Sequence, residues 1–350
     1  MLILNETEIR ELVDADRARA AVGHAFRALQ RDEATLANVV SVPFTRPTGA
    51  AHIKAGHLHD DAIWTIKVSG DFYPEGGQSC HSGLMLVLSA RDGTPVGLLI
   101  DNGYLTELRT GAAGAIAAEL LARPDATTAA IIGAGSQARY QLEALLKVRP
   151  IERIQVASRS RERARVFTDE IERNHGLSAR LCDSVRDAVR GVEIVVTTTP
   201  SRDPLIEWEW LDEGTHVTAF GSDEPYKHEL SPQVLAHADV VAVDDRGQAA
   251  RLGELHHAIE SGLSSEEDVV TLGELLEGAA TGRADAGDVT VVDLTGVGVQ
   301  DAAIAALTMR EAARAQAGHL DLRGAARTIS VDSTTLPVST SSAREPEARE

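Results

Sequence analysis

The chain of 350 residues has few of the features that mark disulfide-stabilised, membrane-spanning or nucleic-acid-binding proteins. Its two cysteines, Cys80 and Cys182, stand in unrelated contexts without metal-ligand spacing, so we expect neither a disulfide framework nor a bound metal. No apolar run approaches the roughly 18 residues of a membrane span, and no secretory signal pattern opens the chain. Positive charge is scarce, because 34 Lys and Arg face 53 Asp and Glu, and the net charge of -19 argues against nucleic acid and anionic membranes as partners. We therefore expect a soluble cytoplasmic protein.

The middle of the chain carries the pattern of a strand, a tight turn and a helix. The apolar run 127–132 predicts a buried strand, and the apolar spacing from Ala138 onward predicts a helix. Between them, Gly133 permits the turn and Gly135 lets the backbone approach a pyrophosphate, whose charge would face the N–H groups of Ser136 and Gln137. The pattern predicts a dinucleotide-binding turn. A chance glycine turn is the alternative.

The next strand, 154–157, ends at the position that inspects the adenosine ribose in dinucleotide-binding folds. An acidic side chain there, about 20 residues past the glycines, accepts a hydrogen bond from the ribose in NAD enzymes. This chain has Ser158, Arg159 and Ser160 instead. Because no carboxylate repels a 2′-phosphate and Arg159 can pair with one, the sequence favours NADP(H), with NAD(H) possible. Alternatively, these residues begin a solvated helix face.

Two folding patterns divide the chain. Residues 1–123 combine helical patterns, β-rich pieces, a hairpin signal at Asp92-Gly93 and a small-residue helix over 106–121. Strands and helices alternate over 124–301, which is typical of a doubly wound parallel sheet. A helix from Gln300 returns to the first part, so we assign 302–329 to it. We expect an α/β fold with a Rossmann-type parallel sheet, an N-terminal α+β domain and a disordered tail over 330–350.

Five motifs occur together in one order along the chain. They are Lys67, the Asp101-x-x-x-Leu105-Thr106-x-x-Arg109-Thr110-Gly111 run, the glycine turn, Gly221-Ser222-Asp223-x-x-x-Lys227-x-Glu229-Leu230, and Asp293-Leu294-Thr295-Gly296. With these motifs, residues 1–320 resemble the ornithine cyclodeaminase/μ-crystallin family. The sequences of residues 52–57, 64–69 and 251–258 resemble those of the branch that holds ectoine-utilisation cyclodeaminase-like proteins and iminosuccinate reductases. The resemblance implies NAD(P) chemistry on amino or imino acids and a homodimer joined through the N-terminal domain.

Buried-looking cations supply a candidate substrate clamp. Lys67 sits in an otherwise apolar strand and Arg109 at the start of the small-residue helix, where a charge needs a partner. The resemblance makes both residues ligands of the substrate carboxylate, with Lys67 also catalytic and Arg109 close to the cofactor. A structural ion pair with a protein carboxylate is the alternative. Arg46 is a candidate second clamp, although it also fits a surface arginine.

The resemblance gives the proton-transfer role to Asp223. This residue follows strand 215–220, at the carboxyl edge of the sheet where ligands bind in open α/β folds. Lys227 would contact the cofactor or steer Asp223, while a plain turn or helix cap is the alternative for the segment. Tyr226 departs from the family's frequent glycine, which leaves the substrate unassigned.

Further positions complete the expected cofactor site. The topology and the resemblance place these residues there: Ser82, Arg109, Gly133, Gly135, Ser136, Gln137, Ser158, Arg159, Ser160, Thr198, Gly221, Ser222, Lys227 and Thr295. The pair His256 and His257 has no third ligand nearby in the sequence, so we interpret it as a helix face and expect no metal.

Three functions fit these features. The first is NAD(P)-dependent reduction of a small α-imino acid, or the reverse deamination. The second is a cyclodeaminase of the ornithine, lysine or 2,4-diaminobutyrate type with tightly bound NAD. The third is a non-catalytic NADP-binding protein of the μ-crystallin type, which the intact Lys67, Arg109, Asp223 and Lys227 argue against.

Overall fold

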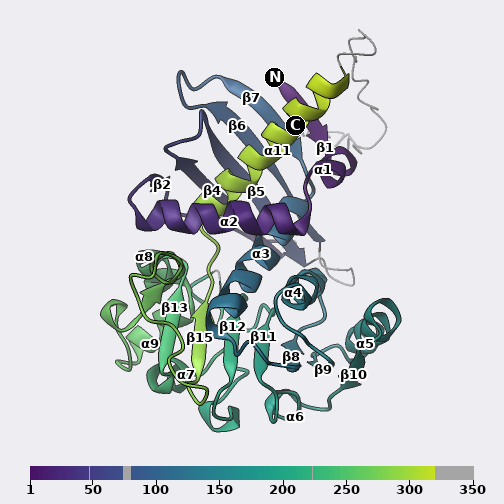
Figure 1. Ribbon diagram of the computed structural model, residues 1–350, viewed down its shortest axis with the longest axis vertical. Coiled ribbons are helices and arrows are strands. Elements are labelled where there is room, and N and C mark those ends of the chain that lie inside the picture. Colours follow the sequence, from purple (N-terminus) through teal and green to yellow (C-terminus); the bar gives the residue numbers. More distant parts are fainter. Residues whose placement is uncertain (47, 74–79, 223, 320–350) are drawn as a thin grey trace, which may run out of the picture. The chain divides into compact units, whose positions relative to one another are not determined.

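The computed structural model describes residues 1–46, 48–73, 80–222 and 224–319, and Met1–Ala312 form one compact unit. Two sheets organise this unit (Figure 1). The first has the order β1-β7-β6-β5-β4-β2, with β3 paired to β4. The second has the order β10-β9-β8-β11-β12-β15-β13-β14, and all its pairs are parallel. The expected α/β class with a Rossmann-type parallel sheet is therefore confirmed.

The strands are β1 (Leu2–Asn5), β2 (Ala34–Leu36), β3 (Val40–Thr45), β4 (Thr48–Leu58), β5 (Ile63–Tyr73), β6 (Cys80–Ser89), β7 (Pro95–Ile100), β8 (Thr128–Ile132), β9 (Arg153–Ala157), β10 (Ser178–Leu181), β11 (Ile194–Thr197), β12 (His216–Ala219), β13 (Val240–Val243), β14 (Val270–Thr271) and β15 (Thr290–Asp293). The α-helices are α1 (Glu6–Leu12), α2 (Ala15–Gln30), α3 (Tyr104–Leu121), α4 (Ser136–Leu146), α5 (Arg161–His175), α6 (Val185–Val189), α7 (Pro232–His237), α8 (Arg246–Leu252), α9 (Glu254–Glu260), α10 (Leu272–Glu277) and α11 (Gly298–His319).

The first sheet is antiparallel except where β1 joins β7. Side chains alternate along β4, so that His52, Lys54 and Leu58 face inward. The β6–β7 hairpin turns at Gly93, whose φ of 74° is the left-handed conformation that the Asp-Gly signal predicts. The register sets Lys54 of β4 directly opposite Lys67 of β5. Two buried lysines thus meet across one strand pair.

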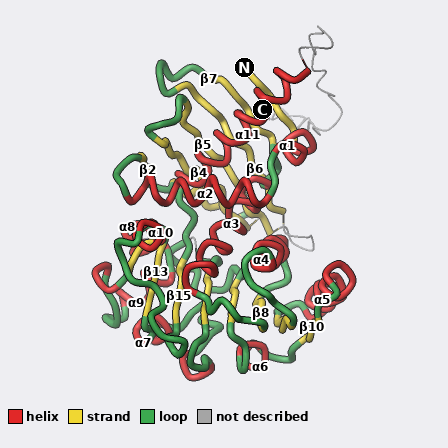
Figure 2. The backbone as a smooth tube through the Cα atoms, in the orientation of Figure 1, coloured by secondary structure: helices red, strands yellow, loops and turns green. Residues whose placement is uncertain are grey.

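The parallel sheet has apolar side chains on both faces, because helices cover both (Figure 2). Val196 belongs to the core under α4 and α5, while its neighbour Val195 belongs to the core under α6, α7 and α9. The strand order reverses between β8 and β11, so the carboxyl ends of these strands open a crevice. Dinucleotides bind at such a switch point.

The helix α3 contacts α4 through its small residues. A Cβ added to Gly111 would lie 2.9 Å from the Tyr140 carbonyl oxygen, and one at Gly114 would lie 2.0 Å from Gln141 Oε1. The small-residue run is therefore required by close helix packing. None of the helices in the described ranges combines the length and apolarity needed to cross a bilayer.

Candidate active site

The glycine turn between β8 and α4 is tightly packed on one side and open on the other. Gly133 has φ 121°, and a Cβ there would lie 2.4 Å from Thr198 Oγ1, so the position excludes a side chain. Gly135 differs, because a Cβ built on it would meet no described atom within 4 Å. Open space therefore lies in front of the first turn of α4, where backbone N–H groups and the helix dipole favour a phosphate. Gly133, Gly135, Ser136 and Thr198 come together here, and their contact with a cofactor stays a prediction.

A carboxylate that the sequence analysis did not single out supports this turn. Gln137 Nε2 donates to Glu107 Oε2 at 2.5 Å, and Gln141 Nε2 donates to Gln137 Oε1 at 2.8 Å. Burial raises the pKa of Glu107, while hydrogen bonding to Ser136 acts in the opposite direction. Residues of α3 thus hold the start of α4, which gives Gln137 an internal partner.

The residues expected at the adenosine ribose lie between β9 and α5. Ser160 caps α5, because its hydroxyl accepts from the Arg163 N–H at 3.3 Å. Arg161 pairs with Asp183 at 2.5 Å. Arg159 is exposed and makes no ion pair with any described residue. It is therefore the arginine of this segment that can turn to a ligand.

Lys67 and Arg109 converge on one buried aspartate. The Lys67 ammonium lies 3.1 Å from Asp301 Oδ1, and Arg109 Nε donates to the same oxygen at 3.0 Å. Arg109 Nη1 also donates to Gln300 Oε1 at 2.8 Å. The side chain of Asp301 is 1 % exposed, and that of Lys67 2 %. The structure therefore brings the two clamp candidates together around a carboxylate that sequence reasoning missed.

The third cation of this region binds backbone oxygens. Lys54 Nζ donates to the carbonyls of Thr295 at 3.0 Å and Gly296 at 2.6 Å, in the connection between β15 and α11. The Thr295 hydroxyl accepts from Gln248 at 2.8 Å and donates to Asp244 at 2.9 Å. This connection is thereby tied both to the first sheet and to the residues that follow β13. The expected contact of Thr295 with a cofactor stays a prediction.

Burial perturbs the charges of the clamp. It lowers the pKa of Lys67 to about 7, with the nearby Arg109 charge acting in the same direction and Asp301 opposing it. Burial would raise the pKa of Asp301, but the Lys67 and Arg109 charges outweigh it and hold that pKa below its ordinary value. The aspartate is therefore ionised at neutral pH, whereas the lysine is poised near its titration point.

Two buried glutamates hold the loop after β12. Glu229 accepts from Gly221 N and Thr197 Oγ1, each at 2.7 Å, and from Thr199 N at 2.7 Å. The Ser222 hydroxyl donates to Glu254, which also accepts from Glu229 N at 2.8 Å. Asp223 lies outside the described residues. Its assignment as acid/base therefore stays a prediction, but both sides of its position are anchored.

The loop also meets the first sheet and α9. Glu224 accepts from Ser41 Oγ of β3 at 2.5 Å and lies 3.2 Å from His52 Nδ1 of β4. The ring of His257 hydrogen-bonds the Lys227 carbonyl at 2.7 Å. This contact gives the histidine a structural role on its helix. Among the residues described, no group of three or more His, Cys, Asp or Glu side chains is arranged to hold a metal.

Two expected ligands lie at more open positions. Arg46 is exposed in the turn between β3 and β4. Ser82 is exposed on β6, opposite Gly70 of β5. Its neighbour His81 pairs with Asp71 at 2.7 Å, so His81 has an internal partner. The roles of Arg46 and Ser82 stay predictions.

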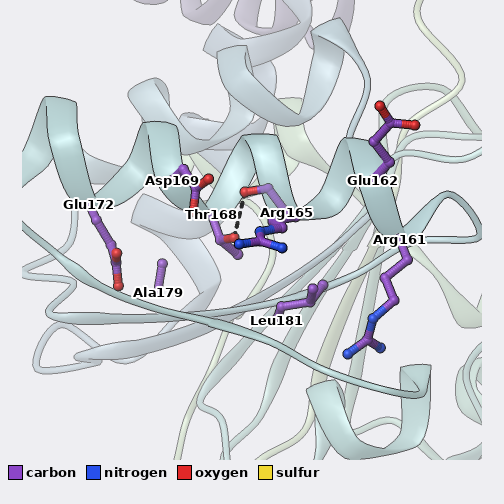
Figure 3. A pocket seen from close by; sticks show the side chains of 8 residues that line it. All are labelled: Arg161, Glu162, Arg165, Thr168, Asp169, Glu172, Ala179 and Leu181. Carbon is purple, nitrogen blue, oxygen red and sulfur yellow. Dashed lines mark hydrogen bonds between the residues drawn. The ribbon is translucent and has the colours of Figure 1, made fainter.

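A surface groove of about 570 Å³ lies elsewhere, between α5 and β10 (Figure 3). Its lining is mostly charged and includes Arg165, Asp169 and Glu172, and Thr168 Oγ1 donates to the Arg165 carbonyl at 2.7 Å. None of the residues expected in the active site lines it. The groove is therefore separate from the clamp and the glycine turn.

Comparisons with known proteins identify the family and agree with the fold. The family described as ornithine cyclodeaminase/mu-crystallin matches residues 1–316. An uncharacterised cyclodeaminase of Sinorhizobium fredii is 42% identical over 325 residues, covering 91% of this chain and 98% of that protein. An archaeal alanine dehydrogenase dimer with bound NAD has a TM-score of 0.83 and 35% identity, covering 90% of this chain and 97% of its own. The Δ1-pyrroline-2-carboxylate reductase of Thermococcus litoralis, in complex with NADH and L-proline, has a TM-score of 0.84 and 27% identity, covering 90% and 98%.

Proposed function

This chain belongs to the ornithine cyclodeaminase/mu-crystallin family, and we propose that it reduces a small α-imino acid with NADPH or NADH, or oxidises the corresponding α-amino acid. The observation that carries the proposal is the charge of the buried clamp. Lys67 and Arg109 share one aspartate, so one positive charge is left in excess while Lys67 is protonated. A substrate carboxylate would neutralise it.

The donors of the clamp are also suited to a second carboxylate. The hydrogen bonds that Arg109 makes to described residues use Nε and Nη1, which leaves Nη2 for a ligand. Arg109 lies beside the β15–α11 connection, where a Cβ on Gly296 would lie 2.8 Å from Nη1. The clamp therefore adjoins the carboxyl edge of the parallel sheet, which supports the proposed place of Arg109 close to the cofactor.

We divide the chemistry between the clamp residues and Asp223. A nicotinamide cofactor held at Gly133, Gly135 and Ser136 would supply or accept the hydride at the α-carbon of the substrate. Lys67 and Arg109 fix the carboxylate and thereby orient that carbon. We assign proton transfer to Asp223, which gives a proton to the imine nitrogen during reduction and takes it back during oxidation. Glu229 and Glu254 hold the backbone on either side of this residue.

We further propose that the enzyme prefers NADP(H). Ser158 brings no negative charge to the ribose position, and Arg159 is exposed beside it. An arginine can form two parallel hydrogen bonds to a 2′-phosphate. The archaeal relative binds NAD and the Thermococcus enzyme NADH, so this preference is a property we assign to the present chain.

We also propose a cytoplasmic homodimer joined through the N-terminal domain, which comprises residues 1–123 and 302–329. Exposed apolar side chains lie on β3 of that sheet, where Val40 is 52% exposed, Val42 41% and Phe44 40%. An apolar strand of this kind is typical of a surface that a partner covers. Light scattering of the purified protein measures the mass directly, and a monomer at micromolar concentration would contradict the proposal.

Absorbance at 340 nm tests the reaction. The protein is mixed with NADPH or NADH, ammonia or methylamine, and pyruvate, glyoxylate or oxaloacetate. We expect oxidation of the reduced nucleotide with at least one pair, faster with NADPH. A flat trace with every pair, together with ammonia release from ornithine, lysine or 2,4-diaminobutyrate and catalytic NAD, would replace the reductase by a cyclodeaminase. An Asp223→Asn variant with unchanged turnover would remove that residue from the mechanism.

A further inference from the structure

We propose that Asp301 is a positioning residue of the substrate clamp: it holds Lys67 and Arg109 together and leaves them one positive charge in excess, so that the clamp accepts a single carboxylate. The proposal rests on the proposed function, since it specifies how the same site recognises its substrate. Without Asp301 the two cations would repel each other in a buried place. A second protein carboxylate bonded to the same two cations would leave no charge for a ligand.

The contacts show how one side chain can do this. Both cations reach Asp301 Oδ1, at 3.1 Å from Lys67 and 3.0 Å from Arg109, and the ammonium lies 3.1 Å from Oδ2 as well. The preceding residue, Gln300, accepts from Arg109 Nη1 at 2.8 Å. Two consecutive residues of α11 thus accept hydrogen bonds from the Arg109 guanidinium and fix its orientation. A planar, two-point contact of this kind restricts an arginine more than a single ion pair does.

Close packing on β4 fixes the position of the backbone that carries Asp301. Asp301 lies in the first turn of α11, and this turn packs directly on β4. A Cβ on Gly298 would lie 2.4 Å from the Ala55 carbonyl oxygen, and one on Gly56 would lie 2.6 Å from the Gly298 carbonyl. Lys54 also fixes the preceding connection through the Thr295 and Gly296 carbonyls. The position of the carboxylate is therefore set by packing rather than by the cations.

The titration of Lys67 gives this role a measurable signature. Lys67 interacts electrostatically with five charged groups from the surrounding elements. They are Lys54 on β4, His81 on β6, Asp101 just before α3, Arg109 on α3 and Asp301 on α11. Burial and Arg109 lower the pKa of Lys67 to about 7, and Asp301 raises it. Removing the aspartate charge must therefore lower that pKa further. Lys67 would then lose its proton, and the clamp its excess charge, at a lower pH.

The experiment compares Asp301→Asn and Asp301→Glu with the wild type by kcat and kcat/KM between pH 5.5 and 9. For the wild type, kcat/KM should fall as pH rises through about 7, while kcat changes less because the bound carboxylate keeps Lys67 protonated. In Asp301→Asn the fall should begin at lower pH, and KM at pH 8 should rise about tenfold or more with a smaller change in kcat. Asp301→Glu should restore the pH midpoint while KM stays raised, because the charge returns at a displaced position.

Asp61→Asn is the matched control. Asp61 also ties α11 to the first sheet, through Arg310 at 2.9 Å, but away from the clamp. This variant should keep the wild-type KM and pH midpoint. If it shifts them as Asp301→Asn does, general loosening of α11 explains the result and the positioning role is overturned. A wild-type pH midpoint in Asp301→Asn would overturn it equally.

Two further measurements keep the outcomes distinct. Circular dichroism shows whether Asp301→Asn is folded, and if it is not, the midpoint and KM of Asp301→Glu decide alone. If the wild type turns over no substrate pair, the proposed function fails, but the clamp is still tested by the rise in unfolding temperature that pyruvate causes in the NADPH-bound protein at pH 6 and pH 8. An equal rise in wild type and the Asp301 variants at both pH values would sink the inference.

Discussion

The protein buries two clusters of like charge at opposite ends of the β15–α11 connection. The basic cluster consists of Lys54, Lys67 and Arg109 and surrounds Asp301 in the first turn of α11. The acidic cluster consists of Glu229, Glu254 and Asp293, and Asp293 ends β15. Both clusters are nearly inaccessible to water. Burial alone therefore does not tell which of them serves a ligand.

The difference lies in how the polar atoms are satisfied. Glu229 accepts on both oxygens from Thr197, Thr199 and Gly221, and burial raises the pKa of Glu229 above its ordinary value. Internal donors thus satisfy this acid, and protonation can remove its charge. In the basic cluster, by contrast, Lys67 and Arg109 share the single carboxylate of Asp301. We infer that Glu229 is structural and that Lys67 and Arg109 bind an anionic ligand.

The largest expected effect comes from removing the clamp lysine. Lys67→Met should lower kcat/KM by about a thousandfold, or about 4 kcal/mol. The substrate carboxylate can then pair only with Arg109, which already pairs with Asp301. Initial rates at 340 nm measure the effect. The matched variant is Lys54→Met, directly opposite on β4, whose lysine bonds carbonyl oxygens. It should reduce stability more than substrate affinity, and equal losses of kcat/KM in both variants would contradict the comparison.

Removing a carboxylate of the acidic cluster should reduce stability rather than substrate affinity. Glu229→Ala leaves the Thr199 N–H, the Gly221 N–H and the Thr197 hydroxyl without their acceptor, so the free energy of unfolding should fall by about 3 kcal/mol. Urea unfolding followed by circular dichroism measures the change. Glu229→Gln keeps one acceptor oxygen and should lose less. If Glu229→Ala keeps wild-type stability while substrate KM rises, the cluster would belong to the ligand and not to the fold.

The parallel sheet was predictable because its strands are short apolar runs between turn residues. The expected strand over 154–157 is Arg153–Ala157, and the glycine turn follows Thr128–Ile132 as its motif requires. The small-residue helix expected over 106–121 is Tyr104–Leu121. Local pattern suffices in these places because burial on both faces and helix contact impose it. The N-terminal strands were located more coarsely, since β3 is exposed along its whole length and carries no alternating burial.

The clamp was predictable only in part. Lys67 and Arg109 stand out because a charge in an apolar segment needs a partner, but the partner Asp301 belongs to a helix far along the chain. Its signal, an acid at the start of a helix whose next turns are apolar, is shared by ordinary helix N-termini. The contacts of Lys54 with backbone carbonyls have no side-chain signal at all. Such pairings depend on how β4 and α11 pack, which no local pattern encodes.

The smallest expected effect contrasts the two aspartates at the ends of the connection. Burial raises the pKa of Asp293 to about 7, and its Oδ1 atom has no hydrogen-bond partner within the described part of the chain, whereas the pKa of Asp301 is lowered. In the unfolded state the pKa of Asp293 is about 3.9, so near pH 5 the folded state holds a proton on this side chain that the unfolded state releases. The contribution of Asp293 to stability therefore falls as pH rises towards 7. Asp293→Asn cannot ionise, so its free energy of unfolding relative to that of the wild type should rise by about 2 kcal/mol between pH 5 and pH 8. Urea unfolding at both pH values would show the change. Asp301→Asn should be destabilised at both, because Asp301 is ionised throughout. Equal changes at pH 5 and pH 8 for Asp293→Asn would mean that Asp293 is already ionised at pH 5, and the two clusters would then handle buried carboxylates alike.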